Sequence, residues 1–254
     1  MKTKANIIFL TASLVFTLPA CLAGESMLHA AVNHKARPDK DRAVDQHRKP
    51  AQVLDFFGLE PGMKVLEFYS ANGYYAEIIS RALGDEGKIY AQAHSGKYWQ
   101  EPLEKRFKND AFKNVSILIA NVEEQAKRYP RNELDMVLMI LTYHDVYDKT
   151  YPENWDVDGS DLLAVAFRAL KPSGVLGVVD HHAGADVEKF RAGGILHRIN
   201  RERAIEEIQA AGFVLEEESF ILRNENDDRS QPSNSEAARR KTDRFILKFR
   251  KPVG

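Results

Sequence analysis

The hydrophobic positions of this chain alternate between short, nearly continuous apolar runs and longer stretches with a helical period. The apolar runs predict buried strands over residues 64–68, 88–93, 115–120, 136–141 and 175–179. Apolar residues three or four positions apart predict helices over residues 50–57, 75–83, 162–170 and 200–211. Two further strands, over 213–222 and 245–249, are separated by a polar linker that we expect to form a mobile loop.

Single residues mark the ends of several predicted helices. Pro50 suits the first turn of its helix, and Gly58 stands where that helix ends. Gly84 follows the second helix, and Asn200 is placed to cap the last one. These signals agree with the boundaries that the apolar period gives.

The order of elements predicts an α/β fold with a Rossmann-like, doubly wound sheet that is mostly parallel. The last two strands follow each other without a helix, which predicts an antiparallel edge. Ligands of doubly wound sheets bind at the carboxyl ends of the strands. The residues immediately after each strand are therefore the candidates for function.

The first 23 residues have the layout of a secretory signal peptide. Two lysines precede an apolar stretch over residues 5–18, and small residues surround a potential cleavage point after Ala23. Residues 18–21 also resemble a lipoprotein box, at which Cys21 would be lipidated; an uncleaved anchor is the third alternative. We expect a periplasmic or exported protein that contacts a membrane only if Cys21 is lipidated.

The rest of the chain divides at residue 50. Residues 24–49 are polar and lack a sustained apolar period, so we expect an N-terminal arm that is part helix and part coil. Residues 50–254 form the predicted Rossmann-like domain. The 36 Lys plus Arg nearly balance the 37 Asp plus Glu, which disfavours a nucleic acid as the partner. The single cysteine cannot form an intramolecular disulfide.

The turn after the first strand carries the first candidate binding motif. Residues 65–75 read VLEFYSANGYY, with Glu67 near the end of the strand and Gly73 opening the next helix. This spacing resembles the first motif of class I S-adenosylmethionine-dependent methyltransferases, in which an acid precedes alternate glycines. Here Tyr69 and Ala71 stand at the first two glycine positions, and Gly73 keeps the third.

Further runs are similar to a bacterial subgroup of predicted, often exported methyltransferases. They read DQHRKP at 45–50, LEPGMKV at 59–65, LKPSGV at 170–175, VDH at 179–181, LHRI at 196–199 and KTDRF at 241–245. The resemblance covers nearly all of the chain after the signal. It implies a seven-stranded sheet whose last strand is antiparallel, and S-adenosylmethionine as the cofactor.

The same resemblance assigns residues to the two ends of the methyl donor. Glu67 and the backbone of Tyr69, Ser70, Ala71 and Gly73 would bind its amino-acid end. An acid that merely favours a helix N-terminus is the alternative interpretation of Glu67. Independently of the resemblance, Arg48 and Lys49 could close over the donor carboxylate from the N-terminal arm, although a solvated charge cluster is the favoured interpretation of the two residues.

The nucleoside end of the donor has fewer family signals. His94 follows the second strand, where typical members carry an acid that binds the ribose. Asn121 follows the third strand and has an amide that can both donate to and accept from adenine, or it is a simple turn residue. Leu141, at the end of the fourth strand, completes the predicted cofactor site.

The candidate catalytic residues follow the fourth strand. The Pro-Pro-aromatic signature usual in methyltransferases that modify nucleic-acid amino groups is absent there. His144 has a side chain that titrates near neutrality, so we predict that it accepts a proton from an O–H or N–H nucleophile, with Asp145 orienting it. A histidine that only packs at the strand end is the alternative.

Aromatic and histidine side chains near the same edge are candidates to line a substrate pocket. They are Tyr143, Tyr147, Trp155 and His181. Loop anchors are the alternative interpretation of the aromatic residues. His181, His182 and His197 would converge with His144 on this edge, but no spacing matches a strong zinc motif, so we expect no bound metal.

Two classes of function remain open at this point. The first is an exported methyltransferase that acts on an oxygen or nitrogen of a small molecule, with catalysis mainly by positioning. The second is a binding or regulatory protein that kept the fold after losing donor chemistry. The two missing glycines, the missing ribose acid and the export signal favour the second, whereas the extent of the resemblance favours the first.

Overall fold

The computed structural model describes residues 27–254 except 94–96, 120–127, 130 and 150–157. Its centre is a seven-stranded sheet with the order β3-β2-β1-β4-β5-β7-β6. The strands are β1 (Lys64–Phe68), β2 (Lys88–Ala93), β3 (Val115–Ile119), β4 (Leu134–Ile140), β5 (Leu170–His181), β6 (Val214–Ser219) and β7 (Arg244–Arg250). The five neighbouring strands β3, β2, β1, β4 and β5 pair in parallel. Strand β7 runs antiparallel to both of its neighbours, β5 and β6. The predicted fold class is confirmed.

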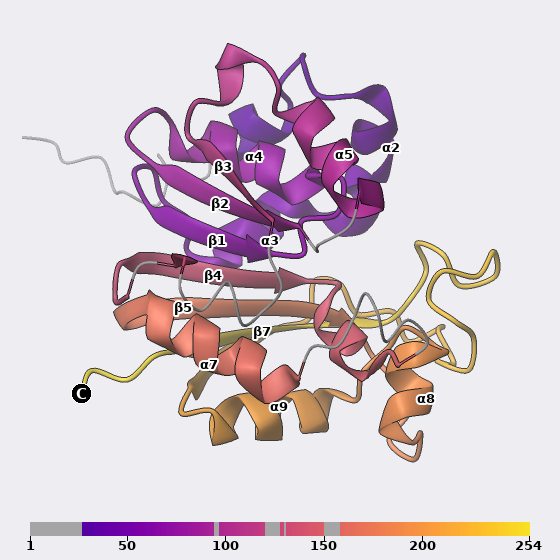
Figure 1. Cartoon of the computed structure of the whole chain (residues 1–254). Coiled ribbons are helices and arrows are strands. Elements are labelled where there is room, and N and C mark those ends of the chain that lie inside the picture. Colours follow the sequence, from indigo (N-terminus) through magenta and orange to yellow (C-terminus); the bar gives the residue numbers. More distant parts are fainter. Residues whose placement is uncertain (1–26, 94–96, 120–127, 130, 150–157) are drawn as a thin grey trace, which may run out of the picture.

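Helices cover both faces of the sheet (Figure 1). They are α2 (Asp39–Arg48), α3 (Pro50–Phe57), α4 (Tyr74–Leu83), α5 (Lys97–Arg106), α7 (Gly159–Ala169), α8 (Lys189–Gly194) and α9 (Arg201–Ala210), with short 3₁₀ turns η1 (Asp110–Phe112) and η2 (Tyr143–Tyr147). Apolar residues of α3 and α4 form one buried cluster with the sheet, and those of α7 and α9 form the other. The apolar runs of the central strands are therefore buried on both sides.

The helix ends predicted from a glycine or a capping asparagine are confirmed. Gly58 and Gly84 follow α3 and α4 with φ of 78° and 67°, a region that glycine enters without steric cost. The side chain of Asn200 accepts a hydrogen bond of 2.9 Å from the backbone of Arg203 and so caps α9.

Other boundaries differ from the prediction. Helices α5 and α8 were not predicted because neither has a clear apolar stripe. Strand β6, which follows α9, is shorter than the predicted strand over 213–222, because it ends at Ser219. Residues 171–174, predicted as a turn, lie within β5, where a register shift and a φ of 64° at Ser173 accommodate them.

The described part of the N-terminal arm is packed against the domain. Asp45 accepts two hydrogen bonds from Arg37, at 2.7 and 2.8 Å, and one of 2.5 Å from the hydroxyl of Tyr74 in α4. The Arg48 guanidinium lies 4.5 Å from the centroid of the Tyr74 ring. The arm thus closes over the beginning of α4, beside the turn that carries the first motif.

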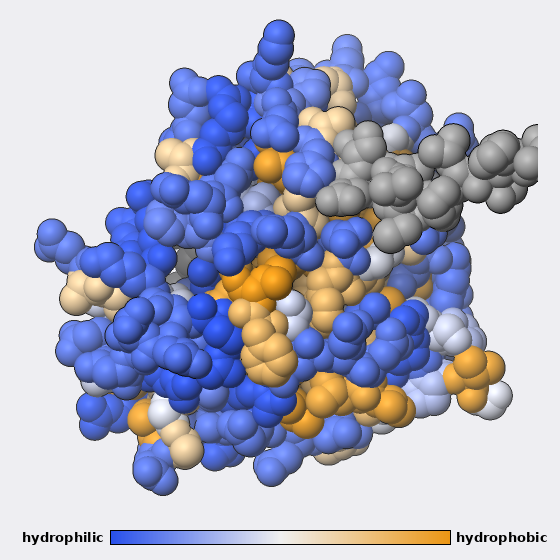
Figure 2. Space-filling model, turned by 180° about the vertical axis from the view of Figure 1, so that it is seen from behind, coloured by the Kyte–Doolittle hydropathy of each residue, from blue (hydrophilic) through white to orange (hydrophobic). Residues whose placement is uncertain are grey.

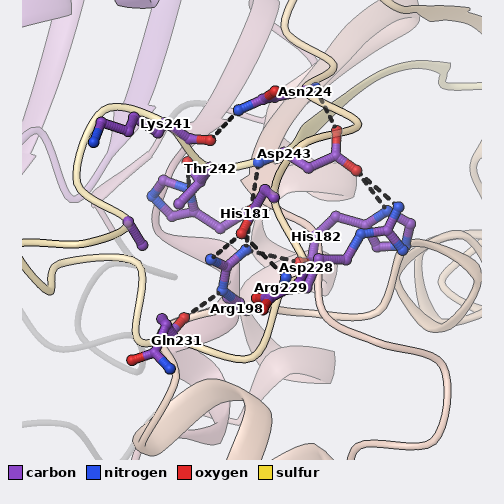
Figure 3. A network of polar contacts seen from close by, with 12 residues as sticks. His181, His182, Arg198, Asn224, Asp228, Arg229, Gln231, Lys241, Thr242 and Asp243 are labelled. Atoms are coloured by element: carbon purple, nitrogen blue, oxygen red, sulfur yellow. Dashed lines mark hydrogen bonds and ion pairs between the residues drawn. The ribbon is translucent and has the colours of Figure 1, made fainter.

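The linker between β6 and β7 is also bound to the domain (Figure 3). Arg198 is fully buried and makes two ion-pair contacts with Asp227, of 2.7 and 3.2 Å. The carboxylate of Asp243, also fully buried, accepts from the Asn224 backbone and from Arg229, both at 2.9 Å. Buried ionic contacts of this kind oppose the mobility that its polar composition predicted.

The surface carries mostly polar residues, with apolar residues gathered near the middle of the face shown in Figure 2. Within the described residues, no helix is both long and apolar enough to span a bilayer. The predicted signal peptide and Cys21 lie outside those residues.

Candidate active site

The predicted site residues that the structure describes lie near the carboxyl ends of the parallel strands, as the fold requires. Strand β4 lies between β1 and β5, so η2, which follows β4, lies between the β1–α4 turn and the end of β5. Helix α8 packs against η2 at the same edge, beyond the arrowhead of β4 (Figure 1).

The β1–α4 turn keeps the backbone of a glycine-rich loop without its first two glycines. Tyr69, Ala71 and Gly73 have φ of 52°, 47° and 76°, so all three alternate positions are left-handed. A non-glycine residue enters this region at a cost of about 1 kcal/mol or more, and such strain concentrates at functional sites. The substitutions at Tyr69 and Ala71 therefore leave the shape of the loop intact.

A buried amide from β2 supports this turn. Gln92 is fully buried, and its Oε1 accepts a 2.9 Å hydrogen bond from the backbone of Tyr69. The carbonyl of Gln92 accepts another, of 2.8 Å, from the backbone of Ser70. By accepting both hydrogen bonds, Gln92 fixes the turn in its strained conformation. Gln92 was not among the predicted site residues, although a polar residue inside an apolar strand is a usable signal.

Glu67 lies under the turn with one polar atom unsatisfied. Its side chain is 4% exposed, and Oε2 has no hydrogen-bond partner among the described residues. Burial raises the pKa of Glu67 to about 7, against opposing contributions from Ser70 and Arg48. A buried carboxylate with a free oxygen matches the cationic amino group of S-adenosylmethionine, so the residues present fit this cofactor.

Gly73 is required by packing as well as by its backbone conformation. A Cβ at this position would lie 2.8 Å from the ring of Phe107 and 2.9 Å from Cδ of Arg106. We expect Gly73→Ala to cost about 2–3 kcal/mol of stability, since a contact penalty adds to the left-handed strain. Urea unfolding measures this difference.

Gly58→Ala is the matched control for that variant. Gly58 is also left-handed, with φ of 78° and ψ of 41° against 76° and 24° at Gly73, but nothing lies within 4 Å of an added Cβ. Only the backbone strain, about 1–2 kcal/mol, should appear there. Equal losses in the two variants would contradict the packing role of Gly73.

His144 lies between two carboxylates. Its Nδ1 is 2.7 Å from Oδ1 of Asp180, and its Nε2 is 3.1 Å from Oδ1 of Asp145. Burial alone would lower the pKa of His144, but Asp145 and Asp180 raise it well above the usual value. At neutral pH both ring nitrogens then carry hydrogen, which disfavours the predicted role as a general base.

Asp145 is close to His144, as predicted, and also faces a second histidine. Nδ1 of His197 lies 3.9 Å from Oδ1 of Asp145. Burial would raise the pKa of Asp145, but the neighbouring His144 lowers it to about 2. The side chains of Asp145 and His197 are 21% and 30% exposed, so this end of the cluster is open to solvent.

The predicted substrate residues have separate surroundings. Tyr143 is 1% exposed and donates a 2.9 Å hydrogen bond to Glu207 of α9. Tyr147 donates to the same carboxylate and packs on Phe190 of α8. Both rings face helices rather than open space. His181 is closer to the cluster, with its ring centroid 6.1 Å from that of His144 and its Nδ1 2.8 Å from Oγ1 of Thr242.

Other predicted residues are placed only in part. Leu141 directly follows β4, has a φ of 60° and donates its backbone hydrogen to the carbonyl of Val179 at 2.7 Å. His94, Asn121 and Trp155 lie outside the described residues. Lys49 points away from the predicted donor, because its Nζ contacts the carbonyl of Ile221 at 2.7 Å.

Asp180 and His197 are functional candidates that the sequence did not place in the catalytic set. Asp180 is fully buried at the end of β5 and accepts hydrogen bonds from both the ring and the backbone of His144. An acid that ends an apolar strand is the sequence signal for it. His197, from the loop after α8, lies beside His144, with ring centroids 5.7 Å apart, as the predicted convergence of histidines on this edge expected.

The N-terminal half of the chain matches a known protein family. The model of the protein-L-isoaspartate(D-aspartate) O-methyltransferase family matches residues 29–127. A protein-L-isoaspartate O-methyltransferase of Methanothermobacter thermautotrophicus is 32% identical over 95 residues, which is 37% of this chain and 43% of that protein. A ubiquinone/menaquinone biosynthesis C-methyltransferase of Shewanella halifaxensis is 28% identical over 128 residues, covering 50% of this chain and 46% of the relative. The chain spans less than half the length of these curated relatives.

Solved structures extend the similarity to most of the chain. A SAM-dependent methyltransferase from Aquifex aeolicus superimposes with a TM-score of 0.58 and 20% sequence identity. The match covers 85% of this chain and all of the other. At this identity the comparison concerns the fold.

Proposed function

We propose that this chain, whose fold is that of the class I S-adenosylmethionine-dependent methyltransferases, transfers a methyl group to an oxygen or nitrogen of a small molecule. S-adenosylmethionine is the cofactor that the family match and the relatives support. The names of the two curated relatives include an O-methyltransferase and a C-methyltransferase, so the acceptor has to be argued from this chain's own residues.

The observation that carries the proposal is the conformation of the β1–α4 turn. Left-handed backbone at Tyr69, Ala71 and Gly73 retains the loop shape that three glycines would give. The loss of two glycines was one of three arguments for a protein that no longer binds the donor. The left-handed backbone weakens that argument and supports an active enzyme over a binding module of the same fold.

The chain's own residues would bind and orient the donor. Glu67 lies where a free carboxylate oxygen can accept hydrogen from the donor amino group, and the backbone of residues 69–73 lines the same end. Arg48, held over the Tyr74 ring, supplies positive charge near Glu67 for the donor carboxylate. When bound, S-adenosylmethionine supplies an electrophilic methyl group on a sulfonium.

The polar cluster at η2 supports an acceptor that carries a hydroxyl or amine. Such a group can donate its hydrogen to Asp145, whose side chain is partly exposed. In the transfer, a bond forms from the nucleophile to the methyl carbon while the carbon–sulfur bond breaks and leaves its electron pair on sulfur. The proton of the nucleophile leaves to solvent beside Asp145. Positioning supplies most of the rate in a step of this kind.

The test is transfer of labelled methyl from S-adenosylmethionine to a panel of small hydroxyl and amine compounds, with identification of the product bond by mass spectrometry. We expect new methyl–oxygen or methyl–nitrogen bonds in a small product. Label found only in a carbon–methyl product, or only in polypeptide, would contradict the proposed acceptor class.

We further propose that the protein is exported, from the sequence of residues 1–23. Cleavage after Ala23 should shorten the protein by 23 residues, whereas lipidation of Cys21 would leave an N-terminal lipid-modified cysteine. The mass of the protein purified from its source organism separates the two routes. An intact N-terminus in a cytoplasmic fraction would contradict export.

A further inference from the structure

Two imidazoles and one carboxylate meet at the open end of the η2 cluster. Ligand atoms of His144, Asp145 and His197 all lie within 4.8 Å of one another. A metal ion bound at about 2.0–2.2 Å keeps neighbouring ligand atoms about 3–3.5 Å apart. The 3.1 Å between Nε2 of His144 and Oδ1 of Asp145 already fits this range, and the 3.9 Å to Nδ1 of His197 requires a small shift.

Asp180 provides the outer support that metal-binding histidines need. It lies 2.7 Å from Nδ1 of His144 and accepts the backbone hydrogen of the same residue at 2.9 Å. With Asp180 holding a hydrogen on Nδ1, Nε2 is the nitrogen that gives up its hydrogen when a metal ion binds. A buried carboxylate behind a histidine in this way fixes the ring and strengthens it as a ligand.

The third ligand is brought in by close packing of α8. A Cβ on Gly193 would lie 2.5 Å from the carbonyl oxygen of His144 and 2.5 Å from Cβ of Tyr147, so only glycine allows the helix to approach η2. The backbone of His197 donates to the carbonyl of Gly193 at 3.2 Å, and its φ is 49°. This close approach and unusual backbone direct His197 to the cluster.

Charge and exposure also favour a cation. Asp145 and Asp180 place two carboxylates around the ring of His144, 3.1 and 2.7 Å from its two nitrogens. His197 and Asp145 are partly exposed, which leaves room for a water or substrate oxygen at the remaining coordination positions.

We infer that His144, Asp145 and His197 bind one divalent transition-metal ion, with Asp180 as the outer support and with open positions toward solvent. Two histidines and one carboxylate suit zinc or iron(II), whereas magnesium prefers a full set of oxygen ligands. This proposal departs from the expectation of no metal, which rested on spacing along the chain. The ligands come from η2 and from the loop after α8, so no local motif could show them.

Calorimetric titration of the full, metal-depleted chain with ZnCl₂ tests the site without any activity assay. We expect one equivalent to bind saturably and MgCl₂ not to compete at tenfold excess. His197→Ala, which alters a partly exposed residue, should weaken zinc binding by more than about 100-fold. Asp180→Asn should weaken it by about 10–100-fold.

His34→Ala is the matched control, because His34 is an exposed histidine outside the cluster. It should leave the zinc affinity unchanged. Circular dichroism of each variant confirms that the fold is retained, and His197→Ala decides the result if Asp180→Asn does not fold. The absence of saturable binding, or equal affinity in His197→Ala and the unmodified chain, would overturn the inference. Since S-adenosylmethionine is absent from this titration, its failure leaves the proposed methyl transfer standing.

Discussion

Replacing Arg198 with methionine should destabilise the protein by about 3–5 kcal/mol, because it leaves a buried carboxylate without its partner. Arg198 is fully buried, and its two contacts with Asp227 are accompanied by hydrogen bonds to the carbonyls of Gln231 and His182, at 2.9 and 3.1 Å. These contacts join the linker to the end of β5 (Figure 3). Urea unfolding followed by circular dichroism measures the change.

Arg250→Met is the control for this prediction. Arg250 also makes two contacts with one carboxylate, that of Glu216, but both side chains are 35% exposed. Exposed pairs contribute about 0–1 kcal/mol, so this variant should lose little stability. A loss at Arg198 no larger than that at Arg250 would show that burial of the Arg198 pair has no energetic weight.

Glu67→Gln should stabilise the ligand-free protein by about 3 kcal/mol at pH 8–9 and have little effect near pH 4. The pKa of Glu67 rises from 4.5 to about 7 on folding, because burial disfavours the charged form. The contribution of protonated Glu67 to the free energy of unfolding is therefore fully present below about pH 4.5. It is lost as the pH rises through 7, where the buried acid ionises. Glutamine stays neutral and avoids that loss.

The measurement is the free energy of unfolding of both proteins across this pH range. Glu60→Gln, at an exposed acid, is the control and should change stability by less than about 0.5 kcal/mol at any pH. Parallel pH profiles for Glu67→Gln and the unmodified protein would contradict the raised pKa. In the same variant, affinity for S-adenosylmethionine should fall at least about tenfold, since a charged hydrogen bond is lost.

The sheet could be predicted because local patterns and global fold agree in this chain. Continuous apolar runs such as 136–141 indicate strands buried on both faces, and Gly58, Gly84 and Asn200 end or begin helices for local reasons. Helix α5 could not be predicted because its charged residues and Pro102 hide the helical period.

The site could be predicted only where it follows directly from a strand end. Glu67, His144 and Asp145 lie where their order in the chain placed them, at the carboxyl edge. The left-handed conformations of Tyr69 and Ala71 could not be predicted, because their side chains disfavour positive φ and Gln92 holds the turn from another strand. The position of His197 depends on α8 packing against η2, which is a tertiary contact.

The central claim is that the β1–α4 turn binds S-adenosylmethionine. Thermal unfolding of the full chain, with and without millimolar S-adenosylmethionine or S-adenosylhomocysteine, tests it most directly. At about 100 times its dissociation constant a ligand adds about 2.7 kcal/mol, which corresponds to a rise of roughly 5–10 °C for a chain of this size. We predict such a rise in the unmodified protein and its loss in Gly73→Val, and an unchanged melting temperature with both ligands would contradict the account.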